Sequence, residues 1–286
     1  MKRYIVKIAW LLALLPLLSS CSNEEELIQP NPPVVNEGEA MLQVKIEFPR
    51  AKSATYAEAT FGATAEEKEI RSIAFFTKNE DEGAPGPDFK EGAFNRFLST
   101  EEPRTSTGLY EPLSGDNGAY TATVKLRSDG FGGNKVKVLV IANYEENGLT
   151  QALKDVPSWD ALTTLTTQPL SNNPVTPLLM VAVDENVPLT NGGMVNVTFN
   201  MDRLVSRIDI ENLASANGFE LTSARLVNPR SYSYAGPSSP NADNIAVAAA
   251  DFDPLLPTQS DPAKITGMYT YESSNSSALT ATAVLI

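Results

Sequence analysis

Apolar and polar residues alternate along most of the chain, a pattern typical of half-buried β-strands. The clearest case runs from Met41 to Phe48, where polar Gln43, Lys45 and Glu47 occupy one face. The other face carries four large apolar side chains, those of Leu42, Val44, Ile46 and Phe48. Period two over this length predicts a strand with one buried face. Further strands are predicted in the same way at residues 70–77, 119–126, 178–183, 194–199, 204–210 and 219–227.

Two segments carry a different pattern. Residues 135–143 are apolar at nearly every position, which predicts a central strand buried on both faces. From Ser158 onward, Trp159, Leu162 and Leu165 recur at helical spacing behind a serine that suits an N-cap. The threonines that follow favour a short helix. We therefore expect an all-β protein with one short helix.

Proline, glycine and small polar residues separate these segments, as in chains of short strands joined by turns. Residues 78–118 are predicted to form a long variable insertion and residues 228–262 a loop. The Asn-Gly-Gly sequence at 191–193 predicts a hairpin turn between the strands at 178–183 and 194–199. A domain boundary is expected near Asn200, where a new set of strands begins.

Composition excludes several classes of enzyme. The 286 residues contain no histidine and a single cysteine, Cys21, which removes Ser-His-Asp triads, Cys-His dyads, His-ligated zinc and disulfides. The formal charge of −13 repels phosphate backbones, so no nucleic acid partner is expected. No catalytic residue, cofactor site or metal site is predicted, and we expect a protein that is not an enzyme.

The N-terminus has the form of an export signal. Three basic residues, Lys2, Arg3 and Lys7, precede an eleven-residue apolar run at 8–18 that is too short to span a bilayer. The run ends Leu-Ser-Ser-Cys at 18–21, which resembles the lipobox of bacterial lipoproteins, where the cysteine thiol is diacylated and the signal is cut before it. The alternative is an ordinary signal peptide with an incidental cysteine. Acylation of Cys21 would supply the multi-chain anchor that stable membrane attachment requires.

An acidic and proline-rich segment follows the cysteine. Residues 22–26, Ser-Asn-Glu-Glu-Glu, resemble the signal that exports lipoproteins to the cell surface in some Gram-negative bacteria; a solvated spacer is the alternative. Residues 27–39 carry three prolines and are predicted to be an extended tether.

Three other clusters favour simple structural explanations. The acidic residues Glu80, Asp81, Glu82 and Asp88 match no calcium-loop spacing and are expected to form a solvated loop. Glycines at 130–133 precede a strand rather than a helix, so they predict a turn and not a phosphate cradle. Tyr232 and Tyr234 fit either a binding loop or a packed surface turn.

The apolar strand at 281–286 ends the chain abruptly, so we expect the sequence to be a fragment with an incomplete second domain.

Several segments in order resemble the fimbrillins, the lipoprotein precursors of major and minor fimbriae in Gram-negative anaerobes. The segments are the lipobox at 18–21, Met41–Pro49 followed by Arg50-Ala51, Val136–Tyr144, the short helix with Trp159, Leu178–Met180, Asp202–Ile208 with its R-x-x-x-R arginines, and Met268–Ser273. The last departs from the family pattern, since Ser273 replaces the usual asparagine.

The resemblance implies two transthyretin-like β-sandwich domains and assembly by strand exchange. In that family an Arg-specific protease removes the first strand, and a strand from a neighbouring subunit fills the groove that remains. In this chain the cut falls between Arg50 and Ala51. The implied organisation is a signal peptide at 1–20, a tether with a removable strand at 21–50, an N-terminal domain at 51–200 and a truncated C-terminal domain at 201–286.

Simple energetics are compatible with such a removable strand. Each inward side chain (Leu42, Val44, Ile46 and Phe48) contributes roughly 1.5–3 kcal/mol on burial. The sum is comparable with the whole stability of a domain. Removing the strand therefore leaves an open edge and an apolar cleft that favour a replacement strand. The alternative is a permanent strand followed by an exposed arginine.

Two functions compete. The first is a structural subunit of a surface fimbria, anchored by lipid in the outer membrane as a precursor and then processed by a protease and joined to other fimbrial subunits. The second is a lipid-anchored fimbrial anchor, tip protein or surface adhesin that keeps its first strand. The N-terminal residue of the mature protein separates them: Ala51 favours the shaft subunit and acylated Cys21 favours the anchor.

Overall fold

The computed structural model describes residues 34–47, 64–79, 94–98, 108–116, 119–127, 135–170, 174–213, 218–236, 251–271 and 283–286. The described residues from Val35 onward belong to one compact unit. The elements of this unit are β1 (Glu39–Glu47), the 3₁₀ turn η1 (Glu66–Lys68), β2 (Ile73–Asn79), β3 (Phe94–Leu98), β4 (Gly108–Asp116), β5 (Ala119–Arg127), β6 (Lys135–Ala142), α1 (Thr150–Asp155), α2 (Trp159–Thr163), β7 (Met180–Pro188), β8 (Gly193–Asn200), β9 (Asp202–Arg203), β10 (Val205–Glu211), β11 (Arg225–Val227), β12 (Lys264–Tyr271) and β13 (Ala283–Leu285).

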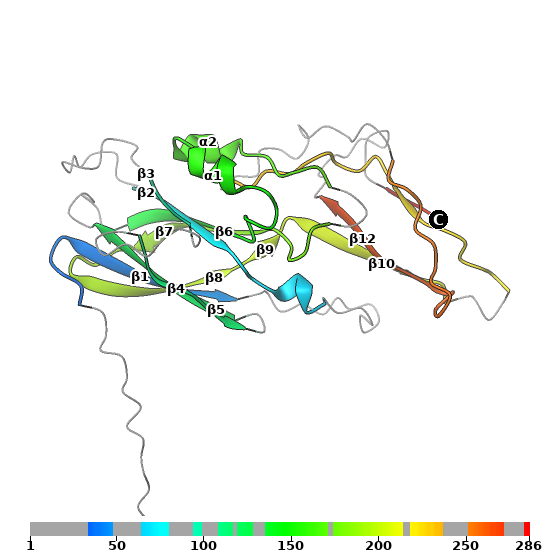
Figure 1. Cartoon of the computed structure of the whole chain (residues 1–286), viewed down its shortest axis with the longest axis horizontal. Helices are drawn as coiled ribbons and strands as arrows, with labels where there is room; N and C mark the ends of the chain where they lie inside the picture. Colours follow the sequence, from blue (N-terminus) through cyan, green and yellow to red (C-terminus); the bar gives the residue numbers. More distant parts are fainter. Residues whose placement is uncertain are drawn as a thin grey trace, which may run out of the picture. The chain divides into compact units, whose positions relative to one another are not determined.

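Two sheets pack face to face as a sandwich (Figure 1). One has the strand order β4-β5-β1-β8 and the other β3-β2-β6-β7-β9. Alternate side chains of β1 and β5 share one buried apolar cluster with alternate side chains of β2, β6 and β7. This shared core is what an alternating pattern produces when two sheets face each other. The expected all-β sandwich fold is confirmed.

The strand β6 is buried on both faces, as predicted. Val136, Val138 and Val140 point into the sandwich core, whereas Leu139 and Ile141 belong to a second buried cluster on the opposite face. Helices α1 and α2 cover that opposite face with the side chains of Leu153, Trp159 and Leu162 (Figure 1). The continuous apolar run in β6 therefore reflects two packed layers rather than one.

Of the two α-helices among the described residues, α2 was predicted and α1 was not. Helix α2 begins after Ser158, whose hydroxyl accepts a hydrogen bond from the Ala161 N–H at 3.2 Å, as expected of an N-cap. The sequence analysis missed α1, which spans Thr150–Asp155. The residue before it, Leu149, has no side-chain capping bond, and only Leu153 within the helix is buried. Its stability comes from packing on the sheet and not from a local signal.

Two predicted connections are corrected. The segment 78–118 is not a plain insertion, because it contains β3 and β4. Glycines at 192 and 193 do form a turn, in which the Gly193 N–H donates to the Thr190 carbonyl at 3.0 Å. The turn does not close a hairpin, since β7 pairs with β6 and β9 whereas β8 pairs with β1 in the other sheet. The chain crosses between the sheets here, which local sequence does not distinguish from a hairpin.

Asn143, at the end of β6, joins three segments. It is fully buried with a left-handed φ of 63°, a conformation that asparagine tolerates well. Its side-chain carbonyl accepts the Arg71 N–H at 2.9 Å, and its amide donates to the carbonyls of Glu69 and Leu178 at 2.9 and 2.7 Å. These bonds fix the chain that leads into β2.

The later strands form two small sheets, β10-β12 and β11-β13. A third apolar cluster lies with them, and its buried members are Leu221, Ala224, Leu226, Ile265 and Met268. The predicted strands at 204–210, 219–227 and 281–286 correspond to β10, β11 and β13, although β11 is limited to Arg225–Val227. The boundary expected near Asn200 stays a prediction.

Candidate assembly site

The first strand lies inside its sheet and not at an edge. β1 pairs antiparallel with β5 along its whole length, from Glu39 opposite Arg127 to Glu47 opposite Ala119. On its other side it pairs in parallel with β8, from Ala40 opposite Gly193 to Glu47 opposite Asn200. Taking β1 away would therefore break two ladders and separate β8 from the rest of its sheet. The slot between β5 and β8 is the candidate site.

Three of the four predicted inward side chains are described, and all three are buried. Leu42, Val44 and Ile46 are at most 1% exposed and belong to the sandwich core. Ile46 lies opposite Tyr120 of β5, which is also in this core. Phe48 lies outside the described residues. The inner face of β1 thus contributes only apolar side chains to the site.

The outer face of β1 is mixed. Lys45 is exposed and forms a surface ion pair with Glu47 at 2.6 Å. Met41 is fully buried, although the alternating pattern places it on the outward side. Thr123 and Lys125 of the neighbouring β5 are buried as well. Burial on both faces at this end of β1 was not expected from a half-buried pattern.

Polar contacts fix the start of β1. Glu39 accepts hydrogen bonds from the backbone and side-chain nitrogens of Asn36, both at 3.0 Å, and its other oxygen pairs with Lys125 at 2.8 Å. The hydrogen bond from Lys125, followed by that from the Asn36 backbone, lowers the pKa of Glu39 below its ordinary value. The Gly38 N–H donates to the Asn191 side chain at 2.7 Å. The start of β1 is therefore tied to β5 and to the turn before β8.

The processing residues predicted from the sequence are not placed by the structure. Cys21, Arg50 and Ala51 all lie outside the described residues, so acylation and cleavage stay predictions. The chain is described again from Thr64. What is described is the end of β1, where the Glu47 carbonyl accepts the Met201 N–H at 3.0 Å.

A buried polar cluster includes residues that follow shortly after the undescribed residues 48–63 in the sequence. Glu67, in η1, has a side chain only 3% exposed. Its carboxylate accepts hydrogen bonds from the Thr64 N–H at 2.7 Å, from Arg207 at 3.2 Å and from the Tyr269 hydroxyl. Arg203 donates two hydrogen bonds to the Glu67 backbone carbonyl, each at 3.3 Å. We call Glu67, Arg203, Arg207 and Tyr269 the Glu67 cluster.

The charges of this cluster are mutually satisfied. Burial alone would raise the pKa of Glu67, but hydrogen bonds from Tyr269 and Thr64 and the charge of Arg207 outweigh burial and lower it. Burial and the bond to Glu67 raise the pKa of Tyr269 to about 12. Arg207 also pairs with Asp209 at 3.0 Å. The cluster is thus a closed network in which the carboxylate is held ionised.

The cluster as a unit was not predicted from the sequence. Only the R-x-x-x-R spacing of Arg203 and Arg207 and the stretch that contains Tyr269 stood out there. Their common partner, Glu67, is separated from them by more than a hundred residues and stands in a sequence rich in glutamate. No spacing rule distinguishes it from Glu66, which is exposed.

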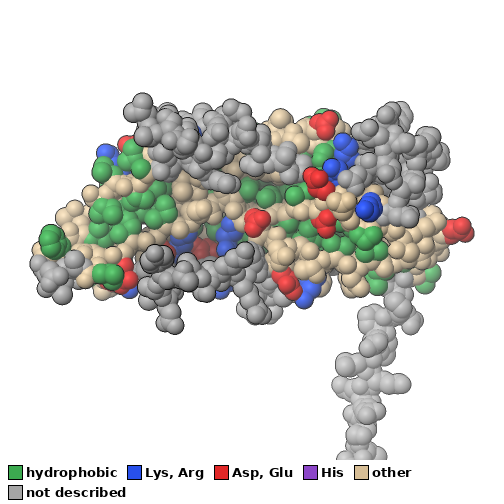
Figure 2. Space-filling model, turned by 180° about the vertical axis from the view of Figure 1, so that it is seen from behind, with side chains coloured by type: hydrophobic (Ala, Val, Ile, Leu, Met, Phe, Trp, Pro, Cys, Tyr) green, Lys and Arg blue, Asp and Glu red, His purple; other side chains and the backbone are tan. Residues whose placement is uncertain are grey.

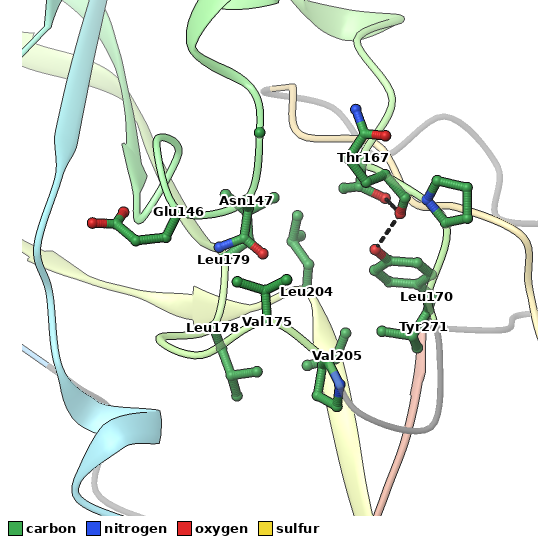
Figure 3. Close-up of a pocket in the computed structure, with 14 residues that line it drawn as sticks. Glu146, Asn147, Thr167, Leu170, Val175, Leu178, Leu179, Leu204, Val205 and Tyr271 are labelled. Atoms are coloured by element: carbon green, nitrogen blue, oxygen red, sulfur yellow. Dashed lines mark hydrogen bonds between the residues drawn. The ribbon is translucent and has the colours of Figure 1, made fainter.

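A cavity of about 260 Å³ opens beside the cluster's strands (Figure 3). Aliphatic side chains including Val175, Leu179 and Leu204 line it. One of its polar groups already binds a protein atom: the Tyr271 hydroxyl donates to the Gln168 carbonyl at 2.7 Å (Figure 3). The cavity is therefore mainly an apolar hollow and does not indicate one class of ligand.

Other predicted features give no second site. Within the described ranges, no three Asp, Glu, His or Cys side chains are grouped to hold a metal ion. The acidic loop with Asp88 and the glycines at 130–133 lie outside those ranges. Tyr232 and Tyr234 pack edge to face with ring centres 5.7 Å apart. Charged side chains of both signs are interspersed on the coloured surface in Figure 2. None of the described helices has the length and apolar content needed to cross a bilayer.

The fold has counterparts among solved bacterial structures. It is similar to a "putative cell adhesion protein" from Parabacteroides distasonis, with a TM-score of 0.52 and 16% identity over 87% of this chain and 74% of that one. A fimbrial assembly protein from the same organism aligns with a TM-score of 0.45 and 20% identity, over 84% of this chain and 78% of that one. No protein-family model matches the chain, and no curated protein matches its sequence. The resemblance drawn from the sequence motifs is thus confirmed at the level of fold.

Proposed function

We propose that this chain is a structural subunit of a cell-surface fimbria and is not an enzyme. It is exported as a lipoprotein precursor acylated at Cys21. A protease then cuts between Arg50 and Ala51 and frees the first strand, and a strand from a neighbouring subunit takes its place. The partners are therefore other fimbrial subunits, the processing protease and, before cleavage, the outer membrane.

The position of β1 is the observation that carries this proposal. A strand held between β5 and β8 contributes Leu42, Val44 and Ile46 to the core, each worth roughly 1.5–3 kcal/mol on burial. Its loss leaves two open strand edges and an apolar slot, which a strand of alternating pattern can fill. The similarity in fold to a cell adhesion protein also favours a role at the cell surface.

The N-terminus of the mature protein tests the proposal. We expect protein isolated from assembled surface polymers to begin at Ala51. An Arg50→Ala variant should keep its first strand and stay unpolymerised, while the neighbouring Lys52→Ala variant should be processed normally. Wild-type polymers that still contain residues 39–47 would contradict strand replacement.

A second candidate function is a lipid-anchored fimbrial anchor, tip protein or adhesin. The polar contacts at the start of β1, such as the Glu39–Lys125 pair, favour it because they hold the strand in place. In that case the mature protein should begin at acylated Cys21, and a Cys21→Ser variant should leave the membrane.

A further inference from the structure

We infer that the Glu67 cluster is a retention clamp: it keeps the segment that follows the predicted cut docked on the protein while the first strand leaves. This inference rests on the proposed strand replacement. The cut would make residue 51 a new N-terminus, only a short distance in sequence from η1. Because the cut frees the chain at that point, the segment around η1 must be held by contacts of its own once β1 has left.

The contacts of Glu67 are independent of β1. Its carboxylate is bonded by Thr64 of its own turn, Arg207 of β10 and Tyr269 of β12. Its backbone carbonyl is bonded by Arg203 of β9. None of these donors belongs to the first strand, so removal of that strand breaks none of these bonds.

A second set of bonds supports the same segment. The buried Asn143 side chain binds the Glu69 carbonyl and the Arg71 N–H. The chain from Glu67 to Arg71 is therefore fixed at alternate residues by strands β9, β10 and β12 and by Asn143, directly after β6. All of these strands remain after the cut.

The clamp also shapes the slot. Ile70, three residues after Glu67, is buried in the sandwich core, and its N–H donates to the Tyr120 hydroxyl at 3.1 Å. Tyr120 is the residue opposite Ile46 at the end of β1. Holding Glu67 in place therefore holds Ile70 and Tyr120 where the end of an incoming strand must pack. The slot would stay open in the shape that the first strand leaves.

Charged groups suit this task better than apolar ones. Apolar side chains can repack in shifted positions, whereas a buried carboxylate needs its donors in one arrangement. The R-x-x-x-R spacing supplies two of them, because Arg203 reaches the backbone and Arg207 the side chain of one residue. The arginine pair thus acquires a function that its spacing alone does not reveal.

The test uses the full chain with a site-specific protease sequence in place of residues 53–58. Hydrogen exchange at amides 64–71 is measured before cutting, after cutting and after the N-terminal fragment is removed in mild urea. Uptake of a labelled peptide with the sequence of residues 39–50 is measured on the emptied protein. For the unsubstituted cluster we expect protection at 64–71 to persist throughout and the peptide to bind.

Variants separate the clamp from general stability. Glu67→Gln should speed exchange at 64–71 by about tenfold or more in the emptied protein and weaken peptide uptake. Tyr269→Phe keeps the ring and loses one hydrogen-bond donor, so it should show a smaller change in the same direction. It keeps the test decisive if Glu67→Gln does not fold. Glu66→Gln, at the exposed neighbour, should change neither measurement.

The outcomes distinguish the clamp from the proposed function. Loss of protection at 64–71 as soon as the first strand leaves, or full protection in Glu67→Gln, would overturn the clamp. Protection at 64–71 that persists in the emptied protein, together with no peptide uptake, would support the clamp and overturn strand replacement.

Discussion

The two segments on either side of residues 48–63 are held in opposite ways. β1 is held mainly by two backbone ladders and by aliphatic side chains such as Val44, with the Glu39–Lys125 ion pair at its start. The chain around η1 is held by a carboxylate, two arginines and a tyrosine hydroxyl. Backbone ladders and aliphatic contacts can be reproduced by any strand of the same pattern, whereas the Glu67 cluster needs its own residues. Under the proposed strand replacement, the difference makes β1 the segment that is exchanged and the chain around η1 the segment that stays.

The largest effect is expected from a charge placed under β1. Val44→Asp buries an unpaired carboxylate in the sandwich core and should lower the free energy of unfolding by more than about 4 kcal/mol. Lys45→Gln, one residue away on the exposed face, should cost less than about 1 kcal/mol, because its pair with Glu47 is a surface one. Urea unfolding of the full chain measures both. Similar costs for the two variants would show that β1 does not bury its inner face.

A smaller but specific effect is expected at the cluster. Arg207→Met leaves the Glu67 carboxylate buried without its cation and should cost about 2–4 kcal/mol, since Arg207 itself is partly exposed. The matched control is Arg71→Met: its pair with Glu69 is exposed on both sides, so this variant should change the free energy of unfolding far less. Equal costs in urea unfolding would remove the contrast between a fixed and an exchangeable segment.

Local patterns were sufficient for the elements that are amphipathic by themselves. The alternation around Val44 and the N-cap at Ser158 each placed an element correctly, because burial and capping act within a few residues. The dense apolar run of β6 also predicted its burial on two faces. The position and buried face of β1 could therefore be predicted from the sequence.

The remaining features depend on contacts between distant residues. Helix α1 has no capping signal, and β7 and β8 look like a hairpin until the sheets are assembled. Glu67 is distinguished from Glu66 only when Arg207 and Tyr269 are brought to it from more than a hundred residues away. The fixed part of the site could not be predicted, because ion pairs leave no period in the sequence.

Acid should weaken the fixed segment. The pKa of Glu67 is lowered on folding, so its contribution to stability is complete above its ordinary value near 4.5 and is lost as the pH falls through the lowered value. The groups that face the Glu67 carboxylate are the Thr64 N–H, Arg207, the Tyr269 hydroxyl and, through Arg207, Asp209. The difference in unfolding free energy between wild type and Glu67→Gln should therefore be constant from pH 7 to 5 and shrink below that.

A second carboxylate, that of Glu39 in β1, should show a similar dependence on acid. The pKa of Glu39 is also lowered, by Lys125 and Asn36, so the difference between wild type and Glu39→Gln should shrink in the same range. At alkaline pH the relevant group is Tyr269, because folding raises its pKa from about 10 to about 12. The contribution of its hydroxyl to the free energy of unfolding is therefore lost as the pH rises through this range. A difference for Glu67→Gln that stays constant down to pH 3 would show that the carboxylate is not bound in its ionised form.

The smallest effect is expected from a change of side-chain shape alone in β1. Leu42→Met conserves volume and apolar character at a buried position and should cost less than about 1.5 kcal/mol. A peptide of residues 39–50 with the same substitution should compete almost equally with the unsubstituted one for the emptied slot, because the ladders to β5 and β8 use backbone atoms only. Competition of the two labelled peptides measures this directly. If Leu42→Met cost more than Arg207→Met, β1 would be fitted to its slot as specifically as Glu67 is to its arginines, and it would have to be regarded as a permanent part of the sandwich.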